Sequence, residues 1–483
     1  MQSLCQNFLQ KMSKSIWKKQ KPENQHPQGT YPPKLIKMFS KQLSVPLCDI
    51  LNTSIVQGKW SKLWKCEMVT PIPKVYPPKT PEDLRNISCL LTFNKVCEKM
   101  ISELMIEDIM KKLDISQYAN QKGVSLQHYL VKMINRILEE TDNNKNSEVN
   151  AIIATMVDWK EAFPRQCPKL GIEAFIKCGV RGSLIPVLIN YLQERKMKVK
   201  WRGLVSSERD LHGGGPQGAT FGIWEYLVQS NENADFVNPE DRYKFVDDLT
   251  ILEKINLLVI GLASFNCQAT VPSNIPTHNQ FIPPEHLKTQ TYLNKIKEWT
   301  KNQKMQLNKK KTKVMLFNFS KKHKFTTSLQ IDEETIEVVD QAKLLGVFIT
   351  NDLKWDKNTE YLVKKANTRM ELLRKVAEFT ASKEDKKDIY ILYIRSILEQ
   401  SCVVWHSSLT SENSQDLERV QKCATRIIMG NEYKNYEDAL EKIGIDSLKE
   451  RREALCLNFA KKCLESENER YNKVFKLKKK SVK

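Results

Sequence analysis

Residues 243–252, Tyr-Lys-Phe-Val-Asp-Asp-Leu-Thr-Ile-Leu, form the stretch of sequence that decides the fold. Two adjacent acids, Asp247 and Asp248, interrupt an apolar run that resumes directly after them. This pattern predicts a strand, a tight turn carrying both carboxylates and a second strand. Aspartate is also common in hairpin turns for purely conformational reasons, so the pair alone is more typical of a solvated turn than of a metal site.

A second acidic position changes this interpretation. Asp158 follows residues 151–157, a nearly continuous apolar run that predicts a strand buried on both faces. A glycine-rich turn, Gly-Pro-Gln-Gly at residues 215–218, lies between the two acidic positions in the sequence. We therefore expect one sheet to bring Asp158 beside Asp247 and Asp248, although the three are far apart along the chain.

Three neighbouring carboxylates predict a particular chemistry. Hard divalent cations prefer carboxylate oxygens, and two such cations can activate a hydroxyl and stabilise a leaving phosphate. The alternative for Asp158 is a helix N-cap before residues 159–161. A P-loop at residues 213–218 is excluded because no Gly-Lys-Ser/Thr follows.

Length and charge set the broad class. At 483 residues the chain is too long for one ordinary core, so two or three subdomains are expected. Lys and Arg number 77 against 57 Asp and Glu, a net charge of +20. This surplus favours a polyanionic partner such as a nucleic acid, with a simple solubility surplus as the alternative. Charge alone does not separate RNA from DNA or from an acidic membrane.

The sequence indicates an intracellular protein without a membrane partner. No apolar run is long enough to span a bilayer, and residues 1–28 lack the apolar region of a signal peptide. The twelve cysteines show neither a Cys-x-x-Cys pair nor zinc spacing, which predicts reduced thiols. The lysine run at residues 478–480 is typical of a solvated end or of a nuclear address, so nucleus and cytoplasm both stay open.

Hydrophobic periodicity predicts a mixed α/β body followed by a helical C-terminal part. Residues 1–32 are expected to be disordered, and residues 261–284 to form a long loop. Helices are expected at residues 93–113, 128–138, 184–192, 217–228, 287–305, 361–379, 386–400, 414–429 and 448–463. Strands are expected at residues 151–157, 197–204, 205–211, 314–317 and 344–349, and a hairpin at residues 329–338.

These segments resemble the sequence boxes of reverse transcriptases. Residues 245–248 (Phe-Val-Asp-Asp) resemble the aromatic-x-Asp-Asp box, residues 158–163 (Asp-Trp-Lys-Glu-Ala-Phe) the Asp-x-x-x-Ala-Phe segment, and residues 214–219 the Pro-Gln-Gly box. Further boxes follow the family order at residues 71–74, 83–88, 308–313, 344–347 and 353–355. Residues 397–405 and 417–421 resemble the thumb of non-LTR elements of the LINE or jockey type. The resemblance runs from about residue 33 to residue 463.

The resemblance implies an α+β fold of the right-hand polymerase type. Its parts would be fingers at residues 33–150, a palm at 151–350 with 165–200 partly in the fingers, a helical thumb at 355–465 and a basic tail at 466–483. The reverse transcriptase domain as a whole would span about residues 55–350.

The resemblance also implies a metal site. Asp158 and Asp247 would each bind both of two Mg²⁺ ions, for which Mn²⁺ could substitute, and Asp248 would support them. The carbonyl oxygen of Val157 would be an extra ligand. Lys311, or its neighbour at position 313, would protonate pyrophosphate as a general acid, although lysine runs are usually only solvated.

Substrate contacts follow from the same resemblance. Phe163 would lie under the sugar of the nucleotide and exclude a 2′-hydroxyl, with plain core packing as its alternative. Gln217 and Gly218 would line the nucleotide and the template edge. Lys74 and Arg85 would hold the incoming triphosphate, or else belong to a solvated face.

The resemblance therefore implies an RNA-directed DNA polymerase with an RNA template, a DNA primer and dNTPs as partners. The alternative is a catalytically inactive or domesticated protein that binds RNA or an RNA–DNA hybrid. An RNA-templated RNA polymerase is disfavoured by Phe163, since such an enzyme must admit a 2′-hydroxyl. The sequence departs from the family at Pro164, where many relatives carry Asp, and at residues 219–224 after the Pro-Gln-Gly box.

Overall fold

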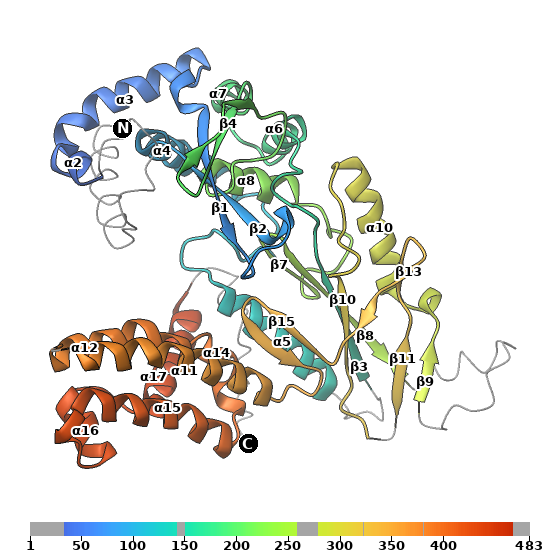
Figure 1. Cartoon of the computed structure of the whole chain (residues 1–483). Coiled ribbons are helices and arrows are strands. Elements are labelled where there is room, and N and C mark those ends of the chain that lie inside the picture. The colour runs from blue at the N-terminus through green and yellow to red at the C-terminus, as the bar shows by residue number, and fades with distance from the viewer. Residues whose placement is uncertain (1–32, 143–149, 258–278, 322, 380, 467–483) are drawn as a thin grey trace, which may run out of the picture. The chain divides into compact units, whose positions relative to one another are not determined.

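A computed structural model describes residues 33–142, 150–257, 279–321, 323–379 and 381–466 (Figure 1). The predicted disorder at residues 1–32, most of the predicted loop at 261–284 and almost all of the basic tail lie outside these residues. The chain divides into two compact units. The first comprises Met1–Asp114, Trp159–Phe236 and Asn294–Asn308, and the second Ile115–Asp158, Val237–Leu293 and Lys309–Lys483.

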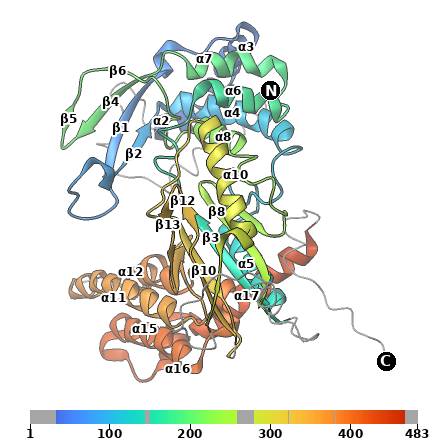
Figure 2. The same ribbon diagram turned by 90° about the vertical axis from the view of Figure 1, so that its right-hand side faces the viewer.

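The first unit combines helices with a small sheet, whose strands run in the order β2-β1-β4-β5, with β6 also paired to β4 (Figure 2). The strands are β1 (Cys66–Pro73), β2 (Leu84–Cys89), β4 (Lys196–Trp201), β5 (Leu204–Val205) and β6 (Arg209–Asp210). The helices are α2 (Pro33–Met38), α3 (Ser40–Gln57), α4 (Thr92–Ile109), α6 (Pro168–Lys177), α7 (Ile185–Leu192) and α8 (Thr220–Gln229). Helix α10 (Lys288–Asn302) begins in the second unit and ends in the first. One hydrophobic cluster, contributed mainly by α3, α4, α7 and α8, forms the core of this unit.

The second unit is built on a five-stranded sheet of order β14-β10-β3-β8-β7 (Figure 1). Its strands are β3 (Asn150–Val157), β7 (Arg242–Phe245), β8 (Asp248–Asn256), β10 (Lys313–Phe317) and β14 (Glu337–Val338). Helix α5 (Leu126–Asp142) packs against it. Smaller strand pairs are β9 (Asn279–Ile282) with β11 (Lys324–Thr327), β12 (Gln330–Ile331) with β13 (Glu334–Thr335), and β15 (Gln341–Leu344) with β16 (Val347–Thr350).

A helical part follows the strands of the second unit. It contains α11 (Asp356–Glu378), α12 (Lys383–Ile389), α13 (Ser396–Leu398), α14 (Cys402–Trp405), α15 (Ser411–Met429), α16 (Tyr436–Ile443) and α17 (Leu448–Glu465). Four of these helices begin at a side chain that accepts a hydrogen bond from a backbone N–H of the first turn, namely Ser382, Thr410, Asn435 and Ser447. The helical part therefore has sequence-encoded starts as well as a buried apolar face.

The α+β class is confirmed, as are most of the predicted elements. Several elements differ. Residues 344–349 form a hairpin, because Leu345 and Gly346 turn the chain at φ values of 48° and 86°. Helix α8 begins at Thr220 and not at Gln217, because Gly218 has φ 106°, which is incompatible with a helix. Helices α6 and α16 and strands β9 and β11 were not predicted.

The ten cysteines among the described residues form no disulfide. The side chains of Trp355 and Trp405 are buried in the core of the second unit. No helix among the described residues is long and apolar enough to cross a membrane.

Candidate active site

The strand register of the second unit brings the three aspartates together. Strands β3 and β8 are antiparallel with Val157 opposite Leu249, so the next pair along this register is Asp158 and Asp248. In the hairpin of β7 and β8, Phe245 pairs with Asp248. Asp247 therefore lies in a two-residue turn, while Asp248 is the first residue of β8 rather than part of the turn as predicted.

The three carboxylates interact electrostatically. Burial, followed by the negative charges of Asp247 and Asp158, raises the pKa of Asp248 to about 7. Asp247 is exposed and Asp158 is half-buried. The N-cap interpretation of Asp158 is wrong, because the next helix, α6, begins only at Pro168. The backbone N–H of Asp158 instead donates to the hydroxyl of Thr312, at 3.2 Å.

The turn that carries Asp247 has a strained backbone that a buried glutamine supports. Val246 has a φ of 56°, a left-handed conformation that is costly for a β-branched residue. Its N–H donates to Oε1 of Gln117, at 3.2 Å, and the N–H of Ala119 donates to the same oxygen at 3.0 Å. The backbone N–H of Tyr118 also donates to the carbonyl of Lys244, at 2.9 Å. Nothing in the sequence alone indicated this role of Gln117.

The donor set fits divalent cations. The pKa of Asp248 is high partly because two other carboxylates repel its charged form, and a cation bound among them would reverse this effect. Within the described residues, no group of three or more His, Cys, Asp or Glu side chains is already arranged around a metal position. This is compatible with ions that take part of their coordination from substrate oxygens and water. The ligand roles of the three aspartates and of the Val157 carbonyl stay predictions.

The lysines before β10 differ in their surroundings. Lys313 forms an ion pair with Glu337, and Lys309 forms ion pairs with Asp332 and Glu334. The side chain of Lys311 is exposed. Its role as a general acid stays a prediction.

The predicted substrate residues belong to the first unit. Strands β1 and β2 pair with Arg85 opposite Ile72, two residues before Lys74, so the alternation of side chains puts Lys74 and Arg85 on one face of the ribbon. Both side chains are exposed, and Nζ of Lys74 donates to the carbonyl of Glu82 at 2.9 Å. The structure leaves them available to a solvated ligand, while their role in binding a triphosphate stays a prediction.

Phe163 and the Pro-Gln-Gly box also lie in the first unit. The ring of Phe163 stacks on Tyr226 of α8, with centroids 5.3 Å apart and planes inclined by 27°. The carbonyl of Gln217 accepts a hydrogen bond from the N–H of Ser88 in β2, at 2.8 Å. Gly218 is required by its positive φ. The carboxylates and Lys311 thus belong to the second unit and the predicted substrate residues to the first.

A buried polar network contacts the start of helix α8, directly after the Pro-Gln-Gly box. Glu98 on α4 accepts from the N–H of Thr220 at 3.0 Å, at the start of α8, and from the hydroxyl of Tyr191 at 2.8 Å. Arg195 lies beside Glu67 of β1, with NH2 and Oε2 3.1 Å apart, and both are almost fully buried. Sequence reasoning missed this network, because buried and solvated charges look alike in a sequence.

Glu225 is an unpaired carboxyl in the same region. It is 1% exposed, and neither side-chain oxygen has a hydrogen-bond partner. Burial raises its pKa to about 7, and the charge of Arg195 acts in the opposite direction. A Cβ at Gly171 would lie 2.7 Å from Oε1 of Glu225, so the glycine leaves the space that this carboxyl occupies.

We expect Glu225→Gln to remove a pH-dependent loss of stability. A folded-state pKa of about 7, above the ordinary 4.5, means that the free energy of unfolding of the wild type falls as the pH rises from about 4.5 to about 7. The total loss is about 3 kcal/mol, taking 1.36 kcal/mol per unit. Chemical denaturation at pH 5 and pH 8 should show this fall in the wild type and a much smaller one in the variant. Parallel pH profiles would contradict the assignment.

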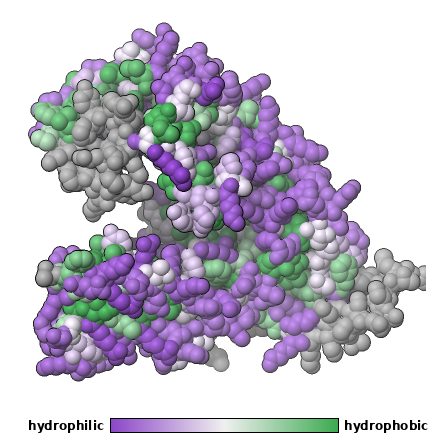
Figure 3. All heavy atoms as spheres, viewed as in Figure 1, coloured by the Kyte–Doolittle hydropathy of each residue, from purple (hydrophilic) through white to green (hydrophobic). Residues whose placement is uncertain are grey.

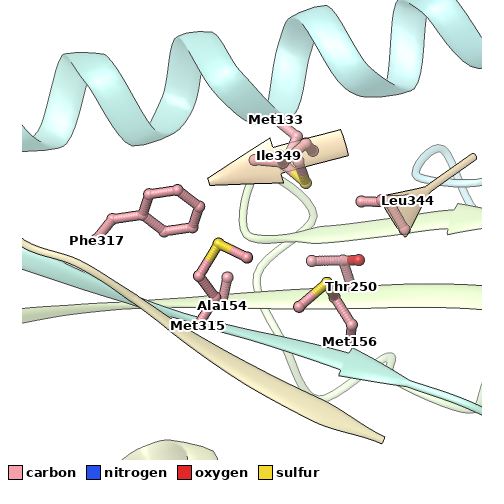
Figure 4. A pocket seen from close by; sticks show the side chains of 8 residues that line it. All are labelled: Met133, Ala154, Met156, Thr250, Met315, Phe317, Leu344 and Ile349. Carbon is pink, nitrogen blue, oxygen red and sulfur yellow. The ribbon is translucent and has the colours of Figure 1, made fainter. Parts of the chain in front are cut away.

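One face of the sheet in the second unit is covered by α5 and by the β15–β16 hairpin. Side chains from α5, β3, β8, β10, β15 and β16 enclose a cavity of about 10 Å³, lined by Met133, Ala154, Met156, Thr250, Met315, Phe317, Leu344 and Ile349 (Figure 4). This volume is at the lower limit for one water molecule, and the walls are mostly apolar. The cavity is a small packing gap between the sheet, α5 and the β15–β16 hairpin.

Three curated proteins of Drosophila melanogaster are similar to the chain, whereas no protein-family model matches it. The probable RNA-directed DNA polymerase from transposon X-element is 22% identical over 413 residues, covering 82% of this chain and 41% of that protein. The one from transposon BS is 24% identical over 388 residues, covering 79% and 40%. The RNA-directed DNA polymerase from mobile element jockey is 24% identical over 298 residues, covering 58% and 29%.

The chain is a distant homologue of the RNA-directed DNA polymerases of non-LTR retrotransposons. This confirms the resemblance seen in the sequence. The chain spans about two fifths of the length of the X-element and BS proteins.

Solved structures of telomerase also align with the chain. Apo telomerase from Candida Tropicalis matches over 86% of this chain and 68% of that chain, with 12% identity and a TM-score of 0.41. Telomerase from Candida albicans, in complex with a fragment of telomeric RNA, matches over 90% and 70%, with 10% identity and a TM-score of 0.37. Scores of this size do not by themselves establish a shared fold.

Proposed function

We propose that the chain is an RNA-directed DNA polymerase that adds dNTPs to the 3′-hydroxyl of a primer on an RNA template. The observation that carries the proposal is the meeting of Asp158, Asp247 and Asp248 at the ends of adjacent strands. The distant homology to retrotransposon polymerases supports the same reaction. Burial and the negative charges of Asp247 and Asp158 raise the pKa of Asp248, and a cation bound among the three carboxylates would relieve this cost.

The carboxylates would hold two divalent cations, Mg²⁺ or Mn²⁺. The chemistry that bound cations supply in such reactions is activation of the hydroxyl and stabilisation of the leaving pyrophosphate. Asp158 and Asp247 would contribute ligand oxygens to both positions, with Asp248 and the Val157 carbonyl in support. Gln117 would hold the turn of Asp247 through the bond to the N–H of Val246.

The first unit would bind the nucleotide. Lys74 and Arg85 would contact its triphosphate, with the guanidinium able to bind two oxygens at once. Gln217 and Gly218 would line the base pair, and the Phe163 ring, supported by Tyr226, would contact the sugar. Lys311 would give a proton to the leaving pyrophosphate.

The helical part near residues 355–465 would hold the template–primer duplex as a thumb, while the fingers would correspond to residues near 33–150 and the palm to residues near 151–350. Its visible face over α12, α15 and α16 is largely hydrophilic (Figure 3). Lys343 and Lys365 flank the ring of Tyr361 on α11, with the ammonium groups 4.2 and 5.7 Å from its centroid. Basic and aromatic side chains of this kind suit backbone contacts to a nucleic acid.

Primer extension on poly(rA)·oligo(dT) with dTTP and Mg²⁺ tests the proposal. Extension by the purified chain, dependent on the cation, is the expected result. If the chain binds the hybrid with a steep salt dependence but extends no primer at any cation concentration, the proposal is wrong and the protein is a binder of RNA–DNA hybrid.

We expect Phe163→Val to relax the choice of sugar. The smaller side chain would leave room for a 2′-hydroxyl, so the preference for dTTP over UTP should fall roughly 10- to 200-fold, the range for one small group in a pocket. Single-nucleotide incorporation with each substrate measures this ratio. An unchanged ratio in an active variant would show that Phe163 only packs against Tyr226.

A further inference from the structure

Gln166 joins three segments of the first unit. It follows Phe163 by three residues, is 2% exposed and has every polar group of its side chain bonded. Its Oε1 accepts from the N–H of Gly215 at 3.1 Å, and its Nε2 donates to the carbonyl of Gly222 at 3.2 Å. Its own carbonyl accepts from the N–H of Gly214, at 2.9 Å. Gln166 therefore links the Phe163 turn, the glycine turn and helix α8.

The glycine turn is shaped to receive this side chain. A Cβ at Gly215 would overlap Oε1 of Gln166, and a Cβ at Gly214 would lie 2.9 Å from the carbonyl oxygen of Pro164. Gly214 also has a φ of 83°, which disfavours any other residue. The two glycines let the backbones of both turns approach closely enough to bond.

The same contacts fix the backbone of Phe163. The N–H of Gly215 lies 3.2 Å from the carbonyl of Phe163, and the N–H of Gln166 donates to that carbonyl at 3.2 Å. Gly215 lies two residues before Gln217, the residue that would line the base pair. The ring of Phe163 rests on Tyr226 of α8, the helix that carries the other partner of Gln166, Gly222.

We propose that Gln166 is a positioning residue that sets the distance between Phe163 and the Pro-Gln-Gly box, and so controls discrimination between dNTPs and rNTPs. The inference rests on the proposed polymerase function. Gln166 touches neither sugar nor base; it acts through Phe163 on one side and the backbone before Gln217 on the other. Loss of its bonds would let the two walls of the nucleotide site move apart, which relaxes selection of the sugar more than it slows addition of dNTPs.

The test compares Gln166→Met with the wild type and with Gln229→Met. Methionine keeps the length of the side chain and removes both side-chain hydrogen bonds. Gln229 is a matched control, because it is buried, lies in the same unit at the end of α8 and donates to the carbonyl of Gln303 at 3.3 Å. The measured quantity is the ratio of kcat/KM for dTTP to kcat/KM for UTP, with melting temperatures taken in parallel.

We expect the ratio to fall about tenfold in Gln166→Met, the scale of one or two lost hydrogen bonds, and to stay unchanged in Gln229→Met. If Gln166→Met does not fold, Gln166→Leu, a smaller side chain that also removes both side-chain hydrogen bonds, should show a similar fall. An unchanged ratio in a folded, active Gln166 variant, or an equal fall in Gln229→Met, overturns the inference. A wild type that makes no DNA overturns the proposed function instead, so the two failures are distinguishable.

Discussion

Asp247→Asn is expected to lower the rate of nucleotide addition at least about a thousandfold, since removing one metal-binding carboxylate costs several kcal/mol of transition-state stabilisation. The fold should survive, because Asp247 is exposed in a hairpin turn and asparagine is well tolerated there. Loss of one of the charges that raise the pKa of Asp248 should also lower that pKa. Rates of dTTP addition measure the loss of activity, and thermal melts of the same preparations show whether the fold survives.

Asp142→Asn is the control for this prediction. Asp142 is exposed at the end of α5 in the same unit and has no role in the proposed site. Its substitution removes the same charge and should leave the rate within about twofold, because the effect of a distant surface charge is screened. A similar loss of rate in both variants would mean that net charge, rather than the site, governs activity.

Arg195→Ala is expected to lower the free energy of unfolding by about 3–5 kcal/mol, the cost of leaving a buried charge without its partner. Arg195 and Glu67 are 1% and 4% exposed, and the guanidinium stacks on the ring of Tyr191 with its carbon 4.6 Å from the centroid. Removal of the Arg195 side chain would leave Glu67 buried without its ion-pair partner and would remove the stacking contact with Tyr191. Chemical denaturation measures the change.

A surface ion pair provides the comparison. Arg374 and Glu371 form an i,i+3 pair on α11 with both side chains more than half exposed. Arg374→Ala should change the free energy of unfolding by no more than about 0.5 kcal/mol. If Arg195→Ala costs no more than Arg374→Ala, the buried pair does not hold β1 in place, and the support of the Pro-Gln-Gly box must come from elsewhere.

Local patterns predicted the strands that carry the carboxylates. The apolar run before Asp158 and the interrupted run around Asp247 correspond to β3, β7 and β8. The helices α11, α15 and α17 were also predicted, because their apolar spacing is a local signal. The strand predicted at residues 344–349 is instead a hairpin that turns at Leu345 and Gly346.

Other features depend on partners that are distant in the sequence. Gln117 and Gln166 read as ordinary polar residues, and only the structure shows that each bonds the backbone of a site segment more than 45 residues away. Buried charged residues such as Glu98 could not be predicted from the sequence for the same reason. The strain at Val246 could not be predicted, because it is imposed by pairing on both sides of the turn and by Gln117.

We expect Asp158, which follows β3, and the aspartates of the β7–β8 hairpin to catalyse DNA synthesis on an RNA template. The most direct measurement is extension of oligo(dT) on poly(rA) with dTTP and Mg²⁺ by the wild type beside Asp247→Asn, each purified identically. The account predicts extension by the wild type and none detectable by the variant. Equal extension by both would contradict it, because the activity would then come from another site or another protein.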